Sequence, residues 1–172
     1  MVLNNPLPTD LFPDRFGMNE NKLKFSVDTE RLFKLGPNFL QSKDGQKALA
    51  DGSLKSEDRL FMALSSSTLL NTTLLLPGKK IIELGEQFDD AYLLLSGEVQ
   101  IVQNDKSYKL GAGSVIGLSE GMVGLASKFS ATALKSVQVK IIPFHRVDAV
   151  IKVLPAELRA ILVTIIKRNL AV

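Results

Sequence analysis

The sequence predicts a mainly β fold with flanking helices, arranged as a sandwich or jelly roll. Short segments that alternate apolar and polar side chains recur between residues 72 and 142, and glycine-bearing turns separate them. Eight of the twelve glycines fall between Gly78 and Gly124, and no proline lies between Gly78 and Ile142. Apolar residues at helical spacing follow from Val147 onward. Together these three features indicate a sheet-based core with helices at its end.

The 172 residues are enough for one core, and we expect the chain to have two parts. Residues 1–55 contain four of the seven prolines and only weak periodicity, which indicates an irregular N-terminal arm with short helices. Residues 56–172 are expected to form the roll and its C-terminal helices.

A helix is predicted where the arm meets the roll. Ser56 is a plausible N-cap, and Glu57 and Asp58 follow it in the first turn, where the helix dipole favours acidic side chains. The apolar residues of this helix share one face: Leu60, Phe61 and Leu64.

Five segments of the roll are predicted as strands, namely residues 73–76, 80–84, 91–95, 98–103 and 137–142. Several of them alternate, as a half-buried strand requires. In residues 98–103, for example, Val99 and Ile101 alternate with Glu98 and Gln100.

Two helices are predicted at the C-terminal end, and Pro155 separates them. The first has apolar residues at positions i, i+3, i+4 and i+7, which are Val147, Val150, Ile151 and Leu154. The second runs over residues 156–170 and has a wide apolar stripe made of Leu158, Ile161, Leu162, Ile165 and Ile166. One side of this stripe can cover the sheet while the other contacts a second copy, so we expect a homodimer through this helix.

Composition excludes several kinds of site. The chain has no cysteine and only one histidine, His145. Disulfides, thiolate metal sites and cysteine nucleophiles are therefore excluded, as are metal sites that need two or three imidazoles from one chain. We expect neither a metal nor a cofactor.

One pattern is typical of an enzyme. Residues 117–121 read Gly-Leu-Ser-Glu-Gly and match the G-x-S-x-G pattern that surrounds a nucleophilic serine. A catalytic triad in hydrolase order also needs an acid and then a histidine after Ser119, but the only acid before His145 is the adjacent Glu120. We therefore expect no enzymatic activity.

We expect neither a signal peptide nor a membrane-spanning segment. Residues 1–17 lack the basic start and apolar stretch of an export signal, and the apolar run at residues 160–166 is too short to span a bilayer. Tryptophan is absent and only two tyrosines occur, so stacking of nucleic-acid bases is poorly supported. We expect a soluble cytoplasmic protein.

An ordered series of motifs carries the functional signal. Gly78 is followed by Gly85-Glu86, then by Tyr92-Leu-Leu-Leu-Ser-Gly-Glu-Val99, and then by residues 110–117 with the sequence Leu-Gly-Ala-Gly-Ser-Val-Ile-Gly. With these motifs, residues 56–170 resemble the cyclic-nucleotide-binding domain family, which includes the bacterial cAMP receptor protein. The resemblance implies a β-roll, or double-stranded β-helix, with C-terminal helices. It also implies a phosphate-binding cassette after Gly117 whose exit strand is residues 130–133.

Two positions of this cassette depart from the family pattern. In the family, a glutamate after the cassette glycine binds the ribose hydroxyl, and here Leu118 follows Gly117. An arginine before the Ser/Thr-Ala pair binds the cyclic phosphate, and here Phe129 stands in that place. Charge-assisted hydrogen bonds contribute about 1.5–3 kcal/mol each, so we expect no cAMP binding of the usual kind. By resemblance, the candidate site residues are Gly117, Leu118, Ser119, Glu120, Lys128, Phe129, Ser130 and Ala131.

Two interpretations of the cassette stay open. Lys128 could replace the arginine, with Ser130 as a hydroxyl donor, although a shift of one residue along a strand turns a side chain to the opposite face. Alternatively, Leu118 and Phe129 make the former pocket apolar, either by filling it or by shaping it for a less polar ligand.

The resemblance implies a stand-alone sensory or regulatory module, of bacterial type, that binds an unknown small molecule or a protein partner. The alternative is a ligand-free scaffold for protein–protein interaction or dimerisation, built on the same fold. No helix-turn-helix follows the terminal helix in the printed chain, so we expect no direct DNA binding.

Overall fold

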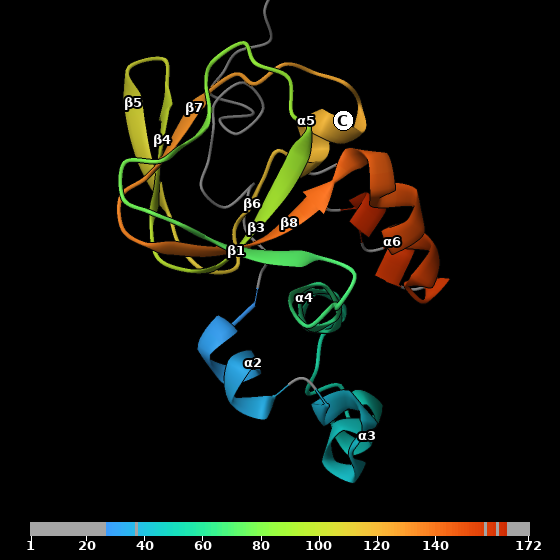
Figure 1. Ribbon diagram of the computed structural model, residues 1–172. Helices are drawn as coiled ribbons and strands as arrows, with labels where there is room; N and C mark the ends of the chain where they lie inside the picture. The colour runs from blue at the N-terminus through green and yellow to red at the C-terminus, as the bar shows by residue number, and fades with distance from the viewer. Residues whose placement is uncertain (1–26, 37, 157, 161, 165–172) are drawn as a thin grey trace, which may run out of the picture.

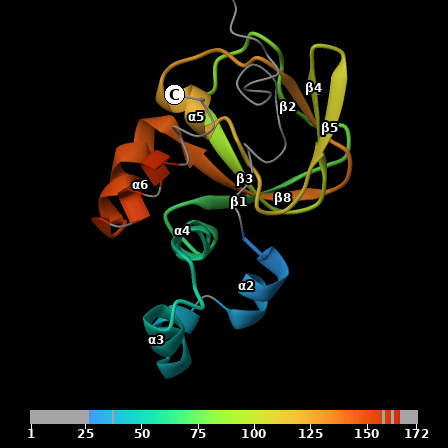
Figure 2. The ribbon, with the colours of Figure 1, turned by 180° about the vertical axis from the view of Figure 1, so that it is seen from behind.

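The computed structural model describes residues 27–36, 38–156, 158–160 and 162–164 (Figure 1). Within them, eight strands form two four-stranded antiparallel sheets that enclose a common core (Figures 1 and 2). The first sheet has the order β1 (Asn71–Leu75), β8 (Val137–Pro143), β3 (Asp90–Ser96) and β6 (Val115–Ile116). The second has the order β2 (Lys80–Ile82), β7 (Ser130–Ala133), β4 (Val99–Gln103) and β5 (Lys106–Leu110). The predicted mainly β jelly roll with flanking helices is confirmed.

All five predicted strands overlap an observed one, and the exit strand expected at residues 130–133 coincides with β7. β5 has no counterpart among the predicted strands. Among the described residues it pairs with β4 alone, and only Tyr108 and Leu110 at its end turn into the core, so its first residues give no apolar alternation in the sequence. Asn104 and Asp105 join β4 to β5 with φ of 50° and 62°, the left-handed conformation that a two-residue hairpin turn favours.

Alternate side chains of both sheets fill the roll. Val99 and Ile101 of β4 are fully buried, whereas Val102 between them and the turn is 40% exposed. From the opposite sheet, Leu94 of β3 and Val139 of β8 belong to the same cluster. The core of the roll is thus built by the period-two alternation that the sequence shows.

In the described part of the chain before α4, three short helices are present: α2 (Thr29–Leu35), η2 (Phe39–Gln41) and α3 (Lys43–Ala50). They form a group with α4 (Ser56–Ser65), on the side of the molecule away from the β4–β5 hairpin (Figures 1 and 2). Leu32 and Leu54 from this segment are buried in one cluster with Phe61 of α4 and Ile142 of β8. Residues 27–55 therefore share a core with the rest, and residues 1–26 of the predicted arm lie outside the described residues.

The cap of α4 differs from the prediction. The N-cap residue is Lys55, with extended backbone, and Ser56 is the first residue of the helix. The carboxylate of Asp58 accepts a hydrogen bond of 2.9 Å from the backbone N–H of Lys55. The prediction of Ser56 as N-cap is wrong by one residue, because the helix begins at Ser56 itself and the carboxylate of Asp58, its third residue, bonds the N–H of Lys55.

Lys140 of β8 joins the sheet to the end of α4. Its ammonium donates to the carbonyl oxygens of Ser67 at 2.8 Å and Leu70 at 3.2 Å, just after the helix. Burial lowers the pKa of Lys140, which is 8% exposed. A cation at this place is also favoured by the dipole of α4.

After the roll, η3 (Phe144–Arg146) leads into α6 (Val147–Val153), and a further helical stretch follows Pro155. The predicted junction of two helices at Pro155 is confirmed. Leu158 and Leu162 of the last stretch are buried against the core, while Ile161, Ile165 and Ile166 of its predicted stripe lie outside the described residues. No helix in the described part of the chain is long and apolar enough to cross a bilayer.

The turn between β3 and β4 depends on Gly97. Its φ is +88°, and a Cβ atom there would overlap the carbonyl group of Ser136 and lie 2.8 Å from Cα of Val137. We predict that Gly97→Ala lowers the free energy of unfolding by about 3 kcal/mol in urea titrations, because conformational strain and overlap act together. Gly78→Ala is the matched control, since Gly78 has φ of +83° and no atom within 4 Å of its Cβ position. Equal losses for the two variants would contradict the role of the overlap.

Candidate functional site

The segment that the sequence predicts as a cassette lies between β6 and β7. Gly117 ends β6 with φ of +81° and is the N-cap of the short helix α5 (Leu118–Met122). The chain then returns to β7 through a loop that pairs with residues 85–87. Ser127 forms two backbone hydrogen bonds of 2.8 Å there, one with Gly85 and one with Glu86. These bonds bring the segment that carries Phe88 next to the cassette.

Gly117 is packed against an aromatic ring of the protein itself. A Cβ atom at Gly117 would overlap the ring of Phe88, whose Cγ lies 3.0 Å from that position. Glycine is therefore required at position 117 for two reasons, the positive φ and the close approach of Phe88. The sequence analysis did not single out Phe88, because no pattern links it to a glycine 29 positions later.

Phe129 fills the roll from the other side. Its side chain is fully buried, and its ring centroid lies 6.1 Å from that of Phe88 at an interplanar angle of 50°. Ala131 and Ala133 follow it on the inward face of β7 and are also buried. The place where the resemblance puts an arginine is thus occupied by a pair of packed rings.

Leu118 and Phe129 do not face a common space. Leu118 is 2% exposed and belongs, with Met122, to the cluster formed with α4 and the C-terminal helices. Phe129 and Ala131 belong to the cluster inside the roll. The two residues that one open interpretation assigns to a common apolar pocket are therefore divided between two cores.

The other cassette residues lie on different sides of β7 and α5. Lys128 is exposed, and Ser130 is half-buried on the face of β7 opposite to Ala131. Ser119 is 1% exposed, and its hydroxyl has no hydrogen-bond partner among the described residues, whereas His145 is exposed. The described residues give the Ser119 hydroxyl no base, so the G-x-S-x-G pattern is not assembled as a catalytic pair.

Glu120 carries the carboxyl group of the cassette. Burial raises the pKa of Glu120, and the hydrogen bond to its own backbone and the charge of Lys128 oppose this shift. One of its carboxylate oxygens is buried with no hydrogen-bond partner among the described residues. The charged form of Glu120 is therefore poorly solvated in the folded chain.

An open hollow of about 400 Å³ lies beside Phe88, between β2 and the start of β3. Three carboxylates line it, those of Glu86, Asp89 and Asp90. Burial and then the charges of Asp90 and Asp89 raise the pKa of Tyr92, which lines the same hollow. An anion such as a cyclic phosphate would be repelled here.

No protein-family model and no curated protein matches the chain. Among solved structures, one from a study of a cyclic-GMP-dependent signalling pathway that regulates bacterial phytopathogenesis is 15% identical. It covers 69% of this chain and 94% of its own, with a TM-score of 0.56. The chain has the fold of a cyclic-nucleotide-binding domain.

Two further similar structures have lower TM-scores. The EAL enzyme Bd1971 in its halfsite-occupied form is 19% identical over 58% of this chain and 94% of that one, with a TM-score of 0.48. The catabolite activator protein of Thermus thermophilus is 19% identical over 67% of this chain and 50% of that one, with a TM-score of 0.46.

The cyclic-nucleotide-binding fold was predicted from the glycine and tyrosine motifs, and it is confirmed. Those motifs occupy the expected places, since Gly85, Gly97, Gly113 and Gly117 all have φ between +81° and +88°. What the resemblance does not contain is the packing of Phe88 onto Gly117. This domain therefore keeps the turns of the fold while its own side chains occupy the cassette.

The burial of Glu120 predicts a pH dependence. Because the folded chain binds the proton of this carboxyl more tightly than the unfolded chain, stability falls as the pH rises from the ordinary carboxyl pKa to the raised one. We predict that Glu120→Gln is more stable than the wild type at neutral pH, and that the two converge as the pH falls below the ordinary pKa. Urea titrations at several pH values measure this. A constant difference at all pH values would contradict it.

Proposed function

We propose that this chain is a sensory or regulatory module that has the cyclic-nucleotide-binding fold but binds neither cAMP nor cGMP in the usual way. The observation that carries the proposal is the buried contact between Phe88 and Phe129, at the place where the resemblance puts the cation for the cyclic phosphate. A buried apolar pair offers neither charge nor hydrogen-bond donor to a phosphate.

The charges around this pair support the proposal. Glu86, Asp89 and Asp90 surround the hollow next to Phe88, and Lys128 is exposed instead of pointing into the roll. Binding of a cyclic phosphate would require displacing two rings and then placing an anion near three carboxylates. Both steps oppose binding.

A ligand-free scaffold for protein–protein interaction is the second candidate function. The division of Leu118 and Phe129 between two cores favours it, because neither core offers a pocket that contains both residues. In the scaffold, the roll holds the flanking helices in place and a partner binds outside it.

We further propose that the partner of the C-terminal helices is a second copy of this chain. Leu158 and Leu162 point into the core, whereas Val163 is 49% exposed and Val153 of α6 is 64% exposed. An apolar side chain on the outward face of a helix is suited to a symmetric contact between two identical helices.

A thermal-shift screen with cAMP, cGMP, cyclic dinucleotides and apolar metabolites tests the main proposal. We predict no increase of the melting temperature with cAMP or cGMP at millimolar concentration. A ligand at a hundred times its dissociation constant would add about 2.7 kcal/mol to the free energy of unfolding and would be visible. Micromolar binding of cAMP or cGMP would overturn the proposal.

We also predict that Phe129→Ala lowers the free energy of unfolding by about 3–5 kcal/mol, as expected for a ring that fills a core. Phe33→Ala, whose ring is 47% exposed, is the matched control and is expected to lower it by less.

Light scattering tests the second copy. We predict a dimer at high micromolar concentration and a monomer for Val163→Glu, because a carboxylate would lose its hydration in an apolar contact. Val123→Glu is the control, since Val123 is 52% exposed and lies at the end of α5. A monomeric wild type, or equal effects of the two variants, would contradict the proposed interface.

A further inference from the structure

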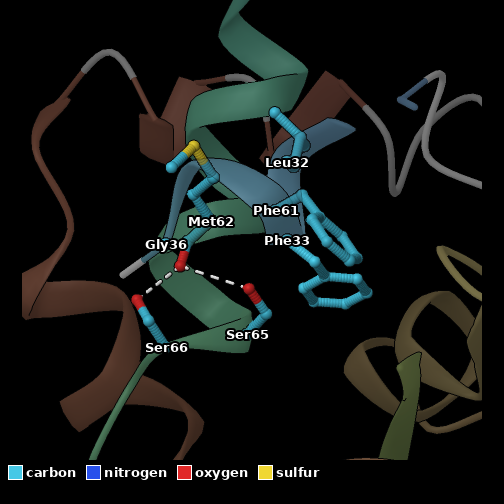
Figure 3. A pocket seen from close by; sticks show the side chains of 7 residues that line it. All are labelled: Leu32, Phe33, Gly36, Phe61, Met62, Ser65 and Ser66. Carbon is cyan, nitrogen blue, oxygen red and sulfur yellow. Dashed lines mark hydrogen bonds between the residues drawn. The ribbon is translucent and has the colours of Figure 1, made fainter. Parts of the chain in front are cut away.

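A second hollow, of about 190 Å³, lies outside the roll between α2 and α4 (Figure 3). Its walls come from one face of each helix. α2 and its C-cap contribute Leu32, Phe33 and Gly36, and α4 and its C-cap contribute Phe61, Met62, Ser65 and Ser66. The spacing within each set is one helical turn, so the hollow follows the groove where the two helices meet.

The walls of this groove are apolar and partly aromatic. Leu32, Phe61 and Met62 are buried, and no charged side chain belongs to the lining. The rings of Phe33 and Phe61 lie side by side, with centroids 5.7 Å apart in an edge-to-face arrangement (Figure 3). Phe33 is 47% exposed, so part of its side chain at the edge of the groove remains open to contact.

Two hydroxyl groups give the groove a polar end. Ser65 and Ser66 both donate to the carbonyl oxygen of Met62, at 3.3 Å and 2.5 Å (Figure 3). Because each hydroxyl donates its proton to that carbonyl, only its lone pairs remain, and these can accept a hydrogen bond. The polar end of the groove therefore accepts a hydrogen bond from an occupant.

We propose that the groove between α2 and α4 binds a small uncharged aromatic molecule with one hydrogen-bond donor, of the size of phenol or indole. A dry cavity of about 150 Å³ lined by aliphatic and aromatic side chains holds a benzene ring, so this volume suits one ring or two fused rings. The ring would extend the edge-to-face pair of Phe33 and Phe61, and the donor would reach Ser65 or Ser66. The site is separate from the roll and does not depend on whether the roll binds a cyclic nucleotide.

An occupant of this groove would also contact α2, which touches the loop that comes before β6 and the cassette. Thr29, the first residue of α2, has its methyl carbon 3.0 Å from the Cβ position of Gly113. Gly113 belongs to the loop that leads into β6 and then Gly117. Binding between α2 and α4 would therefore favour the position of α2 that supports this loop.

The test uses the whole chain and two probes of similar size, phenol and toluene, of which only phenol has a donor. The methyl signal of Met62 in ¹H–¹³C spectra reports on the groove. We expect saturable shifts with both probes and binding of phenol that is about threefold to tenfold tighter, as one hydrogen bond contributes. Shifts that do not saturate, or equal affinity for the two probes, would overturn the proposal.

Variants separate the two parts of the site. Phe33→Ala is expected to weaken both probes by about threefold to tenfold through the lost ring contact. Ser65→Ala combined with Ser66→Ala is expected to remove the advantage of phenol and leave toluene unchanged. Leu84→Ala is the control, because Leu84 is 69% exposed in the turn after β2 and touches no part of the groove lining. An equal loss in Leu84→Ala and Phe33→Ala would also overturn the site.

Discussion

The contact of Phe88 with Gly117 and Phe129 determines what the β-roll of this chain can hold. Gly117 has no side chain, so the ring of Phe88 lies directly on its backbone and meets Phe129 inside the roll. An aromatic pair of this kind contributes about 0.5–1.5 kcal/mol beyond the apolar area that it buries. The same volume cannot both contain these rings and admit a ligand. The packing of the core therefore limits the space that the roll can offer to a ligand.

Much of the fold was predictable because its signals are local. The alternation of Val99 and Ile101 marks β4, and Pro155 marks a helix boundary whatever lies around it. That Phe129 stands where the resemblance puts an arginine was visible as well, since it occupies a motif position. Its consequence was not visible, because Phe88 comes from a distant segment and only the tertiary structure shows that the two rings meet. For the same reason, the sequence did not reveal that Leu118 packs into the helical core.

The helix α5 is held between two aromatic rings. Phe88 packs on Gly117 before the helix, and Phe144 packs on Gly121 within it. Phe144 lies in η3, directly before α6, and contacts the core of the roll as well as the helical core. Movement of α5 would thus require both rings to move, which connects the roll to the C-terminal helices by steric contact. The groove between α2 and α4 is connected to the roll at a different place, where Thr29 of α2 approaches Gly113.

The ring pair also sets what substitutions would be needed to place an anion inside the roll. An arginine in place of Phe129 would put a charge beside Phe88 in an apolar core, and loss of the Phe88 ring alone would leave an empty volume. Each single substitution is costly, and only their combination opens space for an anion. An anion site at this place would therefore require both phenylalanines to be replaced together, because either replacement alone leaves a buried charge or an empty volume in the core.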